Sequence, residues 1–527
     1  MKTLKTIMLA AASALAFAGC DKFLDVMPDN RTELDTKEKI QTFLTSAYPA
    51  TDYMLLTEYS SDNVDNYGQS NPNTDRFIDQ VFAWQDITET NNESDEMVWE
   101  RSYIAIAAAN QAIEAIEDMG GAEEAGYTAE MAEALICRAY SHFVLVNIFA
   151  KHYNSETSAT DPGITYMLQP EQGLDPKYER NSVAEVYDYM DKDIQAALPW
   201  ISDGYYTVPK YHFNKKAAYA FAAKFYIFYE KYDLALKYAD MCLGSQPSTM
   251  LRDWLDQSKM TQDSDVLTEH YIDAKLNCNL MLLTAYSTMG MNFGPYRHYS
   301  RYSHGNYLAQ NEDGIALTIL LGTNNSGFYY SPMKVYTATN LDKVIFWKLP
   351  YLFEYTDPVA GIGYNRTVYP AFTSDYLLLE RAEAKIMLKR YDEAAEDMNI
   401  WMSNISKKDW DLTVEEINDL VKDVDYSKWN FSTIKKRLNP KFEISEGVQE
   451  NLLHFCLLLK RIEGLGSGLR WFDVKRYGIE IERREMGEDG NPLKLLDVLA
   501  VDDGRRALQI PKKVIDAGYE ANRRKDK

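Results

Sequence analysis

Cysteine and histidine are scarce in this chain, which has five cysteines and seven histidines among 527 residues. No two of them stand in a Cys-x-x-Cys pair or a close Cys/His cluster, so we expect no metal site and no cofactor. Cys137, Cys242 and Cys456 lie in apolar helical patterns, while Cys278 does not. We expect these four to be buried free thiols that pack as small hydrophobic groups, with a disulfide as the alternative.

The chain also lacks an excess of positive charge. It has 56 Lys and Arg against 79 Asp and Glu, which gives a formal net charge of −23 at pH 7. Such a charge repels nucleic acid and anionic lipid alike, so we exclude both as partners of the protein surface. Beyond the first 19 residues we see no run long and apolar enough to cross a membrane, which requires about 20 residues.

The N-terminus has the pattern of a lipoprotein signal. Lys2 and Lys5 precede an apolar run over residues 7–18, which is too short to span a bilayer but typical of a secretory signal. The run ends in Phe-Ala-Gly before Cys20, which resembles a lipobox. We predict that residues 1–19 are removed, that Cys20 is acylated, and that residues 20–35 form a polar tether. An ordinary signal peptide followed by an unrelated cysteine is the alternative.

Two helical hairpins with related sequences are the clearest internal pattern. Residues 373–404 and 214–247 each contain two apolar helical stripes separated by a short polar break. A constant offset aligns small or aromatic residues of the two hairpins: Ala223 with Ala382, Tyr232 with Tyr391, and Ala235 with Ala394. The spacing is that of a tetratricopeptide unit, in which small residues allow two helices to pack closely.

The rest of the chain alternates between helical and irregular stretches. Apolar periodicity predicts helices over residues 36–47, 96–119, 128–149, 182–198, 451–462 and 469–477. Periodicity is lost over residues 59–90 and 253–371, where we expect long irregular loops. The predicted fold is therefore mainly α, a scaffold of tetratricopeptide-like hairpins with long irregular insertions that bind ligand.

One cluster of charged residues, near the C-terminal end of the chain, has a catalytic and a structural interpretation. Arg470, Asp473 and Arg476 are spaced so that the carboxylate could bridge both guanidinium groups along one helical face. We favour a structural ion pair beside a buried Trp471 and Phe472.

Several motifs together resemble the SusD/RagB family of outer-membrane nutrient-binding lipoproteins, over nearly the whole chain. They are Cys20-Asp-Lys-Phe-Leu-Asp25, the segment Glu133 to Tyr140, Ala382-Glu383-Ala384, Arg470-Trp-Phe-Asp473 and Ile510-Pro511. The chain departs from the family pattern at Lys460, where an arginine is usual, and at Leu459 and Ser467, where acids are usual.

The resemblance implies a domain organisation, a location and a partner. Residues 36–250 would form an N-terminal helical part and residues 251–527 a C-terminal part, packed together as one globular unit. The protein would be anchored in the outer membrane by its lipid, face the cell exterior, and sit as a hinged lid on a SusC-like TonB-dependent barrel. It would bind rather than catalyse.

The two irregular stretches supply the residue types that a glycan site needs. Sugars present apolar ring faces and hydroxyl edges, which call for aromatic platforms and polar hydrogen-bonding groups. Family members often place the ligand site in the corresponding loops, and we expect these loop residues to contribute little to the helical core. The candidate ligand-binding residues are Asp65, Tyr67, Arg76, Trp84, Tyr296, Tyr299, Tyr302 and Trp347.

Three other functions are weighed against glycan capture. The same scaffold could capture peptide, as in the RagB branch. A surface glycosidase would need two carboxylates about 5 to 10 Å apart, and the many acids do not exclude such a pair. Against it stand the absence of barrel-like βα alternation and of a Gly-x-Ser-x-Gly motif. A cytosolic tetratricopeptide adaptor conflicts with the N-terminal leader.

Overall fold

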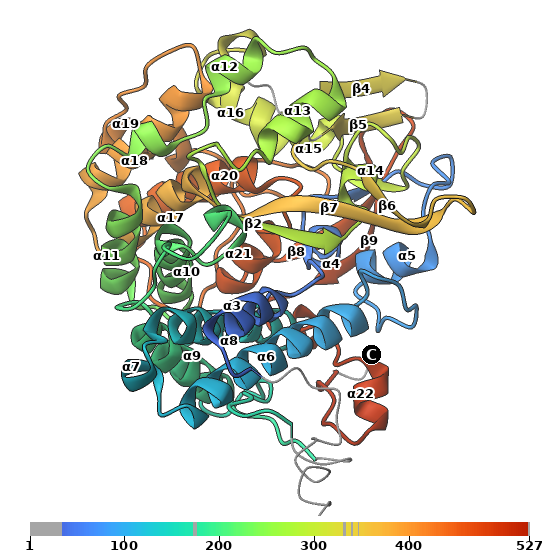
Figure 1. Cartoon of the computed structure of the whole chain (residues 1–527). Coiled ribbons are helices and arrows are strands. Elements are labelled where there is room, and N and C mark those ends of the chain that lie inside the picture. The colour runs from blue at the N-terminus through green and yellow to red at the C-terminus, as the bar shows by residue number, and fades with distance from the viewer. Residues whose placement is uncertain (1–33, 172–176, 330–333, 339–340, 346, 525–527) are drawn as a thin grey trace, which may run out of the picture.

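The computed structural model describes residues 34–171, 177–329, 334–338, 341–345 and 347–524 (Figure 1). The predicted leader, the lipidation residue Cys20 and the tether up to residue 33 lie outside the described residues. The predicted acylation therefore stays a prediction.

The N-terminal part is built around one long helix, α8, against which α6 and α9 pack. Side-chain caps fix where its helices begin: Thr36 accepts a hydrogen bond from the Lys39 amide, and Ser182 forms a capping box with Glu185. The predicted helices are confirmed in this part. They are α3 (Lys37–Leu44) with the short 3-10 helix η1 (Thr45–Ala47), α6 (Asp95–Asp118), α8 (Thr128–Phe149) and α9 (Val183–Ala197). The one-turn helix α7 (Ala122–Ala125), between α6 and α8, was not predicted.

Helix α8 differs from expectation in one respect. Within the part of the chain that the structure describes, it is the single helix long and apolar enough to cross a membrane, whereas we expected none. Because 94% of its apolar window is buried inside the molecule, the helix has the surroundings of a core helix.

Both predicted hairpins are confirmed. They are α10 (Lys215–Phe228) with α11 (Tyr232–Leu243), and α17 (Ser374–Met387) with α18 (Tyr391–Ile405). Their first helices end alike, with Glu230 and Lys389 in the left-handed region at φ 58° and 60°. The amide of the next residue then reaches back to close the last turn. Helix α17 packs against both α10 and α11, so the two hairpins share one core.

Helix α20 (Val448–Gly464) is buried along most of its length. The other helices of the C-terminal part are α19 (Val414–Lys422), α21 (Arg470–Arg476), the 3-10 helix η5 (Gly504–Arg506) and α22 (Lys512–Asp516). Helix α20 lies between α17, α19 and α21.

The predicted bridge within α21 is wrong. Asp473 instead accepts a hydrogen bond from Lys460 at 2.7 Å, Arg470 binds Asp62 with two hydrogen bonds, and Arg476 pairs with Glu383. Each of these three side chains faces a different neighbouring element. Its bond to a residue of that element replaces the predicted bridge within α21. The structural interpretation holds, because Trp471 is fully buried and Phe472 lies in the core.

The two stretches without periodicity contain short helices and strands instead of loops alone. In the first are α4 (Met54–Ser60), β1 (Asp65–Asn66) and α5 (Arg76–Phe82). Before and within the second are η2 (Pro209–Tyr211), η3 (Pro247–Met250), α12 (Trp254–Ser258), α13 (Ser264–Tyr271), β2 (Asn279–Tyr286), α14 (Met289–Phe293), β3 (Tyr302–Ser303), α15 (Asn306–Asn311), α16 (Gly314–Leu320), η4 (Asn325–Gly327), β4 (Lys334–Ala338), β5 (Leu341–Ile345), β6 (Leu352–Asp357) and β7 (Ile362–Thr373). The mainly α fold is nevertheless confirmed.

Small sheets position the irregular segments. One sheet has the order β2-β7-β6 with antiparallel neighbours, and β4 pairs with β5 as a separate hairpin. A third sheet has the order β3-β1-β8-β9 and includes β8 (Ile481–Met486) and β9 (Pro492–Leu499). Strand β1 is antiparallel to β3 and parallel to β8, so it joins three distant segments of the chain.

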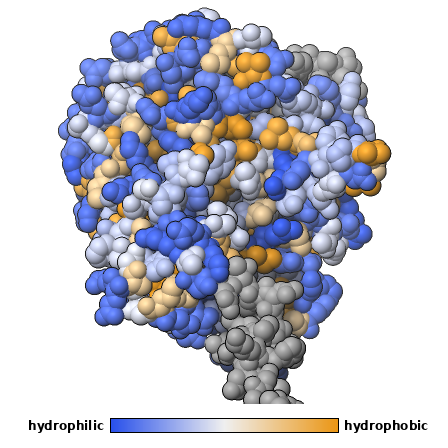
Figure 2. All heavy atoms as spheres, viewed as in Figure 1, coloured by the Kyte–Doolittle hydropathy of each residue, from blue (hydrophilic) through white to orange (hydrophobic). Residues whose placement is uncertain are grey.

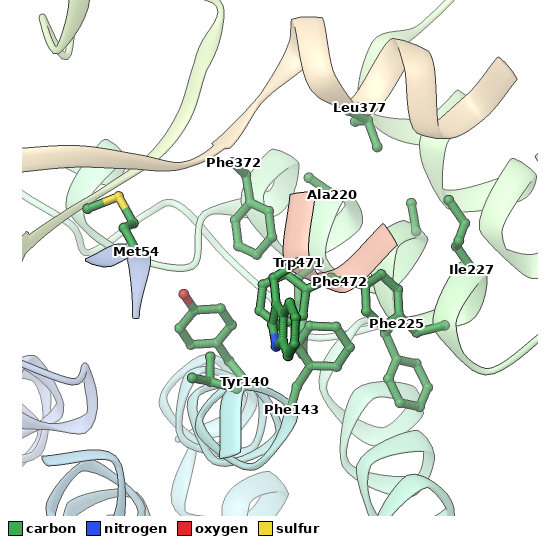
Figure 3. Close-up of a cluster of buried hydrophobic side chains, with 14 of the residues drawn as sticks. Met54, Tyr140, Phe143, Ala220, Phe225, Ile227, Phe372, Leu377, Trp471 and Phe472 are labelled. Atoms are coloured by element: carbon green, nitrogen blue, oxygen red, sulfur yellow. The ribbon is translucent and has the colours of Figure 1, made fainter. Parts of the chain in front are cut away.

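The hydrophobic core is continuous from Ile40 to Ile510. Figure 3 shows aromatic side chains from α8, α10, β7 and α21 meeting in it. The rings of Tyr140 and Phe372 lie 5.9 Å apart, for example. The boundary predicted between residues 250 and 251 stays a prediction.

The four cysteines of the described residues are free and buried, as expected. Burial raises the pKa of the Cys242 and Cys278 thiols to about 12. These thiols are therefore protonated and pack as hydrophobic groups.

Candidate ligand-binding surface

The two irregular stretches that contain the candidate residues are joined by backbone hydrogen bonds. Strand β1 pairs with β3, and beyond the strands the Tyr67 amide donates to the Arg301 carbonyl at 2.7 Å. Asn73 and Tyr299 continue the ladder, with the Asn73 amide donating to the Tyr299 carbonyl at 3.0 Å. Residues 67–76 and 296–301 thus form one surface, which we call the loop surface. In Figure 1 it lies on the right, near α5 and α14.

Three of the eight candidate side chains are exposed on or beside this surface. Tyr296 and Tyr299 are 38% and 45% exposed, and Arg76 is exposed while it pairs with Glu89 at 3.2 Å. The Tyr296 ring packs on Tyr351 with 5.2 Å between centroids, and its hydroxyl donates to Asp265. Partial burial and the Asp265 bond raise the pKa of Tyr296, so the phenol is neutral at pH 7.

Tyr299 has an unusual backbone. Its φ is 54°, in the left-handed region that bulky residues avoid. Of the four non-glycine residues with positive φ in the described part, Trp84, Glu230 and Lys389 follow the ends of helices, where this conformation closes the last turn. Tyr299 follows no helix end. Such strain costs about 1–3 kcal/mol and tends to occur at functional sites.

Trp84 and Tyr302 are buried, at 6% and 7% exposure. The Trp84 indole donates to the Ser60 carbonyl at 2.9 Å, and the guanidinium of Arg483 lies 4.4 Å from its ring. The Tyr302 ring stacks on Phe82 at 4.1 Å. Both rings belong to the hydrophobic core, so the expectation that these residues contribute little to it is wrong. Their contact with ligand stays a prediction.

Asp65 lies in a buried network of ion pairs. It binds Arg484 at 2.8 Å, Arg484 also binds Glu312, and Glu312 binds Arg461 at 2.9 Å. Burial opposes ionisation of Glu312, but the surrounding cations outweigh it and lower its pKa. Asp62 also has a lowered pKa for this reason. Both carboxylates are therefore ionised, whereas a glycosidase general acid needs a raised pKa.

A cavity of about 210 Å³ borders this network. Its lining combines charged groups with one aromatic ring and includes Asp62, Asp65, Glu312, Lys436, Arg484 and Trp429.

Tyr67 and Trp347 are also buried, at 8% exposure each. Trp347 packs with Leu267 of α13 in a small cluster separate from the main core. Helix α13 also carries the Asp265 carboxylate that holds the Tyr296 hydroxyl. Trp347 thus lies under the helix that orients an exposed candidate.

Comparisons with known proteins identify the fold. Residues 22–227 match the SusD-like family model described as starch-binding associating with outer membrane. A putative sugar binding protein from Bacteroides vulgatus shares 16% identity at a TM-score of 0.66, covering 93% of this chain and 99% of its own. Residues 22–227 are thus SusD-like by their family model, and the fold over nearly the whole chain is that of this solved structure.

Other structures of this SusD-like fold agree. A SusD superfamily protein from Bacteroides thetaiotaomicron has 16% identity and a TM-score of 0.62, with 92% of this chain and 99% of that chain covered. A SusD-like carbohydrate binding protein from Bacteroides vulgatus has 14% identity and a TM-score of 0.61, with 91% and 96% covered. At identities of 14–16% these comparisons show that the fold is shared. No curated protein sequence gives a significant match.

Sequence reasoning missed one aromatic residue of the loop surface. Tyr351 packs on Tyr296 and comes directly before the exposed strand β6. The alternation of Tyr351, Phe353 and Tyr355 was a strand signal that could have revealed it. The half-buried Tyr351 thus joins the exposed Tyr296 and Tyr299 on or beside the loop surface that also carries Arg76, a combination that can stack on apolar rings and bond hydroxyl groups.

Proposed function

We propose that this protein captures oligosaccharide at the cell surface and delivers it to a SusC-like TonB-dependent outer-membrane barrel. The observation that carries the proposal is the exposure of Tyr296 and Tyr299 on a surface held in place from beneath by buried residues. The description of the family as starch-binding supports a glycan as the ligand.

The eight candidate residues divide into two roles in this proposal. Tyr296, Tyr299 and Arg76 touch the sugar, because they are exposed. The others hold the loops that carry these side chains, because their own side chains are covered: Asp65, Tyr67, Trp84, Tyr302 and Trp347. A buried ion pair such as Asp65 with Arg484 is well suited to holding a loop, since breaking it would leave a charge uncompensated.

The membrane attachment in this proposal is the acylated Cys20, with residues 20–35 as a tether between the lipid and the helical body. The family description, associating with outer membrane, supports this location. The net charge of −23 gives the body no attraction of its own for an anionic lipid surface, so the lipid and the barrel partner would supply the attachment.

Calorimetry with purified protein tests the proposal. The ligands are linear oligosaccharides from starch, cellulose, xylan and mannan, and a peptide digest serves as the alternative ligand. Burying an aromatic side chain contributes about 1.5–3 kcal/mol. Tyr299→Ala and Tyr296→Ala should therefore each weaken binding of the cognate sugar about ten- to a hundredfold.

Trp200→Ala is the matched control. Trp200 is 49% exposed and follows α9, on the opposite side of the molecule in Figure 1, so its loss should leave affinity unchanged. Unaltered affinity in both tyrosine variants would contradict the assignment of the surface. Binding of peptide in place of every sugar would favour a RagB-like role, and chromatographic detection of cleaved sugar would favour a glycosidase.

A further inference from the structure

The hairpin of β6 and β7 projects from the body of the protein, on the right in Figure 1. All six residues of β6 are exposed, and Val359 at the turn is 99% exposed. Figure 2 shows apolar residues at the end of this projection. An exposed hydrophobic strand at a sheet edge is a hazard that proteins normally avoid, so this one calls for a functional explanation.

One face of the hairpin carries a row of aromatic rings. Side chains alternate along a strand, so Phe353 and Tyr355 share a face, and the same period leads back to Tyr351. Phe353 and Tyr355 are 41% and 59% exposed, with 4.9 Å between their ring centroids. We call Tyr351, Phe353 and Tyr355 the aromatic row.

A glycine opposite the row makes room for it. Gly363 of β7 pairs with Tyr355. A Cβ atom added to Gly363 would come within 2.8 Å of a ring carbon of Phe353 and closer still to the Glu354 carbonyl. The Phe353 ring thus lies against bare backbone, a close approach that only glycine permits.

The opposite face of the hairpin makes contacts with the body of the protein, although Tyr364 on it is still 45% exposed. Tyr364, which pairs with Glu354, packs edge-on against Tyr286 at 5.4 Å. The guanidinium of Arg366 lies 4.5 Å from the Tyr286 ring and that of Arg101 lies 5.4 Å from it. Both faces of the hairpin are thus open to solvent, and the face of Phe353 and Tyr355 is the one that leads along the strand to Tyr351.

The aromatic row is continuous with the loop surface. Tyr351 packs on Tyr296 with 5.2 Å between ring centroids and 47° between ring planes. A ligand lying on Tyr296 would therefore meet Tyr351 next and then Phe353 and Tyr355 along the strand. Alternate residues on one strand face are about 6.6 Å apart along the backbone, and the Phe353 and Tyr355 rings lean together to 4.9 Å between centroids with 73° between their planes. A line of rings along an extended strand suits an extended ligand.

We propose that the aromatic row extends the ligand site, so that the protein binds a glycan chain longer than the loop surface alone can hold. This inference rests on the proposed function. Each ring would stack on the apolar face of a further sugar residue, and the polar groups of the sugars would remain in water. The protein would then select long oligosaccharides over short ones by adding contacts along the hairpin.

The test compares three- and seven-residue members of the linear oligosaccharide series from starch, cellulose, xylan and mannan, by calorimetry on the full chain without its leader. Wild-type protein should bind the heptasaccharide of its cognate series more tightly than the trisaccharide. The double variant Phe353→Ala, Tyr355→Ala should lose about tenfold or more in heptasaccharide affinity and change trisaccharide affinity by less than twofold.

Two controls make the result specific. Tyr364→Ala removes an aromatic ring from the other face of the same hairpin and should preserve the preference for length, whereas Tyr296→Ala should weaken both lengths. The double variant alters only exposed side chains, so its melting temperature should match that of the wild type.

The outcomes separate this inference from the proposed function. If Tyr296→Ala weakens binding while the double variant keeps full heptasaccharide affinity, the extension is refuted and capture at the loop surface stands. Equal loss for both lengths in the double variant also refutes an extension. If wild-type protein binds no oligosaccharide of any series, the proposed function is refuted and this inference with it.

Discussion

Replacing Lys460 by methionine should destabilise the protein by about 3–5 kcal/mol at neutral pH, the usual effect of breaking a buried ion pair. The Lys460 ammonium lies 2.6 Å from Glu383 and 2.7 Å from Asp473. The three side chains are at most 3% exposed. Methionine has a similar volume, so the variant leaves little cavity, and the change is mainly electrostatic.

Glu383 and Asp473 lose different shares of their stabilising partners in this variant. Glu383 keeps Arg476 and the Tyr477 hydroxyl, which donates to it at 2.8 Å. Asp473 loses the ammonium that binds it at 2.7 Å. The expected loss is therefore that of one buried charge left without its partner.

The pH dependence has a definite sign. Burial opposes ionisation of Glu383, but Arg476 and Lys460 outweigh it and lower its pKa from 4.5 to about 2. In the wild type Glu383 thus stabilises the fold above pH 4.5, and this stability is lost as the pH falls toward 2. In the variant the Lys460 ammonium no longer helps to lower this pKa, so the difference between the two proteins should shrink as the pH falls from 4.5 toward 2.

Urea unfolding followed by tryptophan fluorescence at pH 7 and at about pH 3 measures this difference. Lys512→Met is the control, because Lys512 is 76% exposed in its pair with Asp516 and exposed pairs contribute about 0–1 kcal/mol. A loss below 1 kcal/mol for Lys460→Met at pH 7, or a loss that grows in acid, would refute the reasoning.

Two further predictions concern the fold beneath the site and the membrane anchor. Trp84→Ala should lower stability by about 3–5 kcal/mol, measured by urea unfolding, whereas the exposed Trp200→Ala should change it little; equal effects would contradict the supporting role of Trp84. Cys20→Ala should move the protein from the membrane fraction to the soluble fraction of cells that lack the barrel partner. Retention in the membrane of such cells would disprove the lipobox interpretation.

The helical scaffold could be predicted because its signals are local. Small residues such as Ala223 and Ala382 recur at helical spacing, and Thr36 and Ser182 cap the helices that follow them. These effects act within a few residues of each other, so the sequence alone reveals them.

The candidate site could be predicted only in part, because distant residues decide which side chains are covered. Like Tyr299, Trp84 and Asp65 are aromatic or polar residues of a stretch without helical periodicity. Unlike Tyr299, they are buried, in contact with Arg483 and Arg484. The failed bridge in α21 has the same cause, since Arg470 pairs with Asp62, 408 positions away. The spacing of neighbouring residues in the sequence does not reveal ion-pair partners that lie hundreds of positions away.

The contacts between the first loop and the end of the chain have a consequence for the timing of synthesis. Arg461 donates hydrogen bonds to Asn63 and Asp62, which lie 398 and 399 positions before it. Arg483 donates to the Ser61 carbonyl, which lies 422 positions before it. During synthesis the first loop emerges long before these partners exist. An interrupted chain would therefore leave the Asp62 carboxylate without the cations of Arg461 and Arg470. The buried contacts of the first loop are thus completed only after the C-terminal part of the chain has been made.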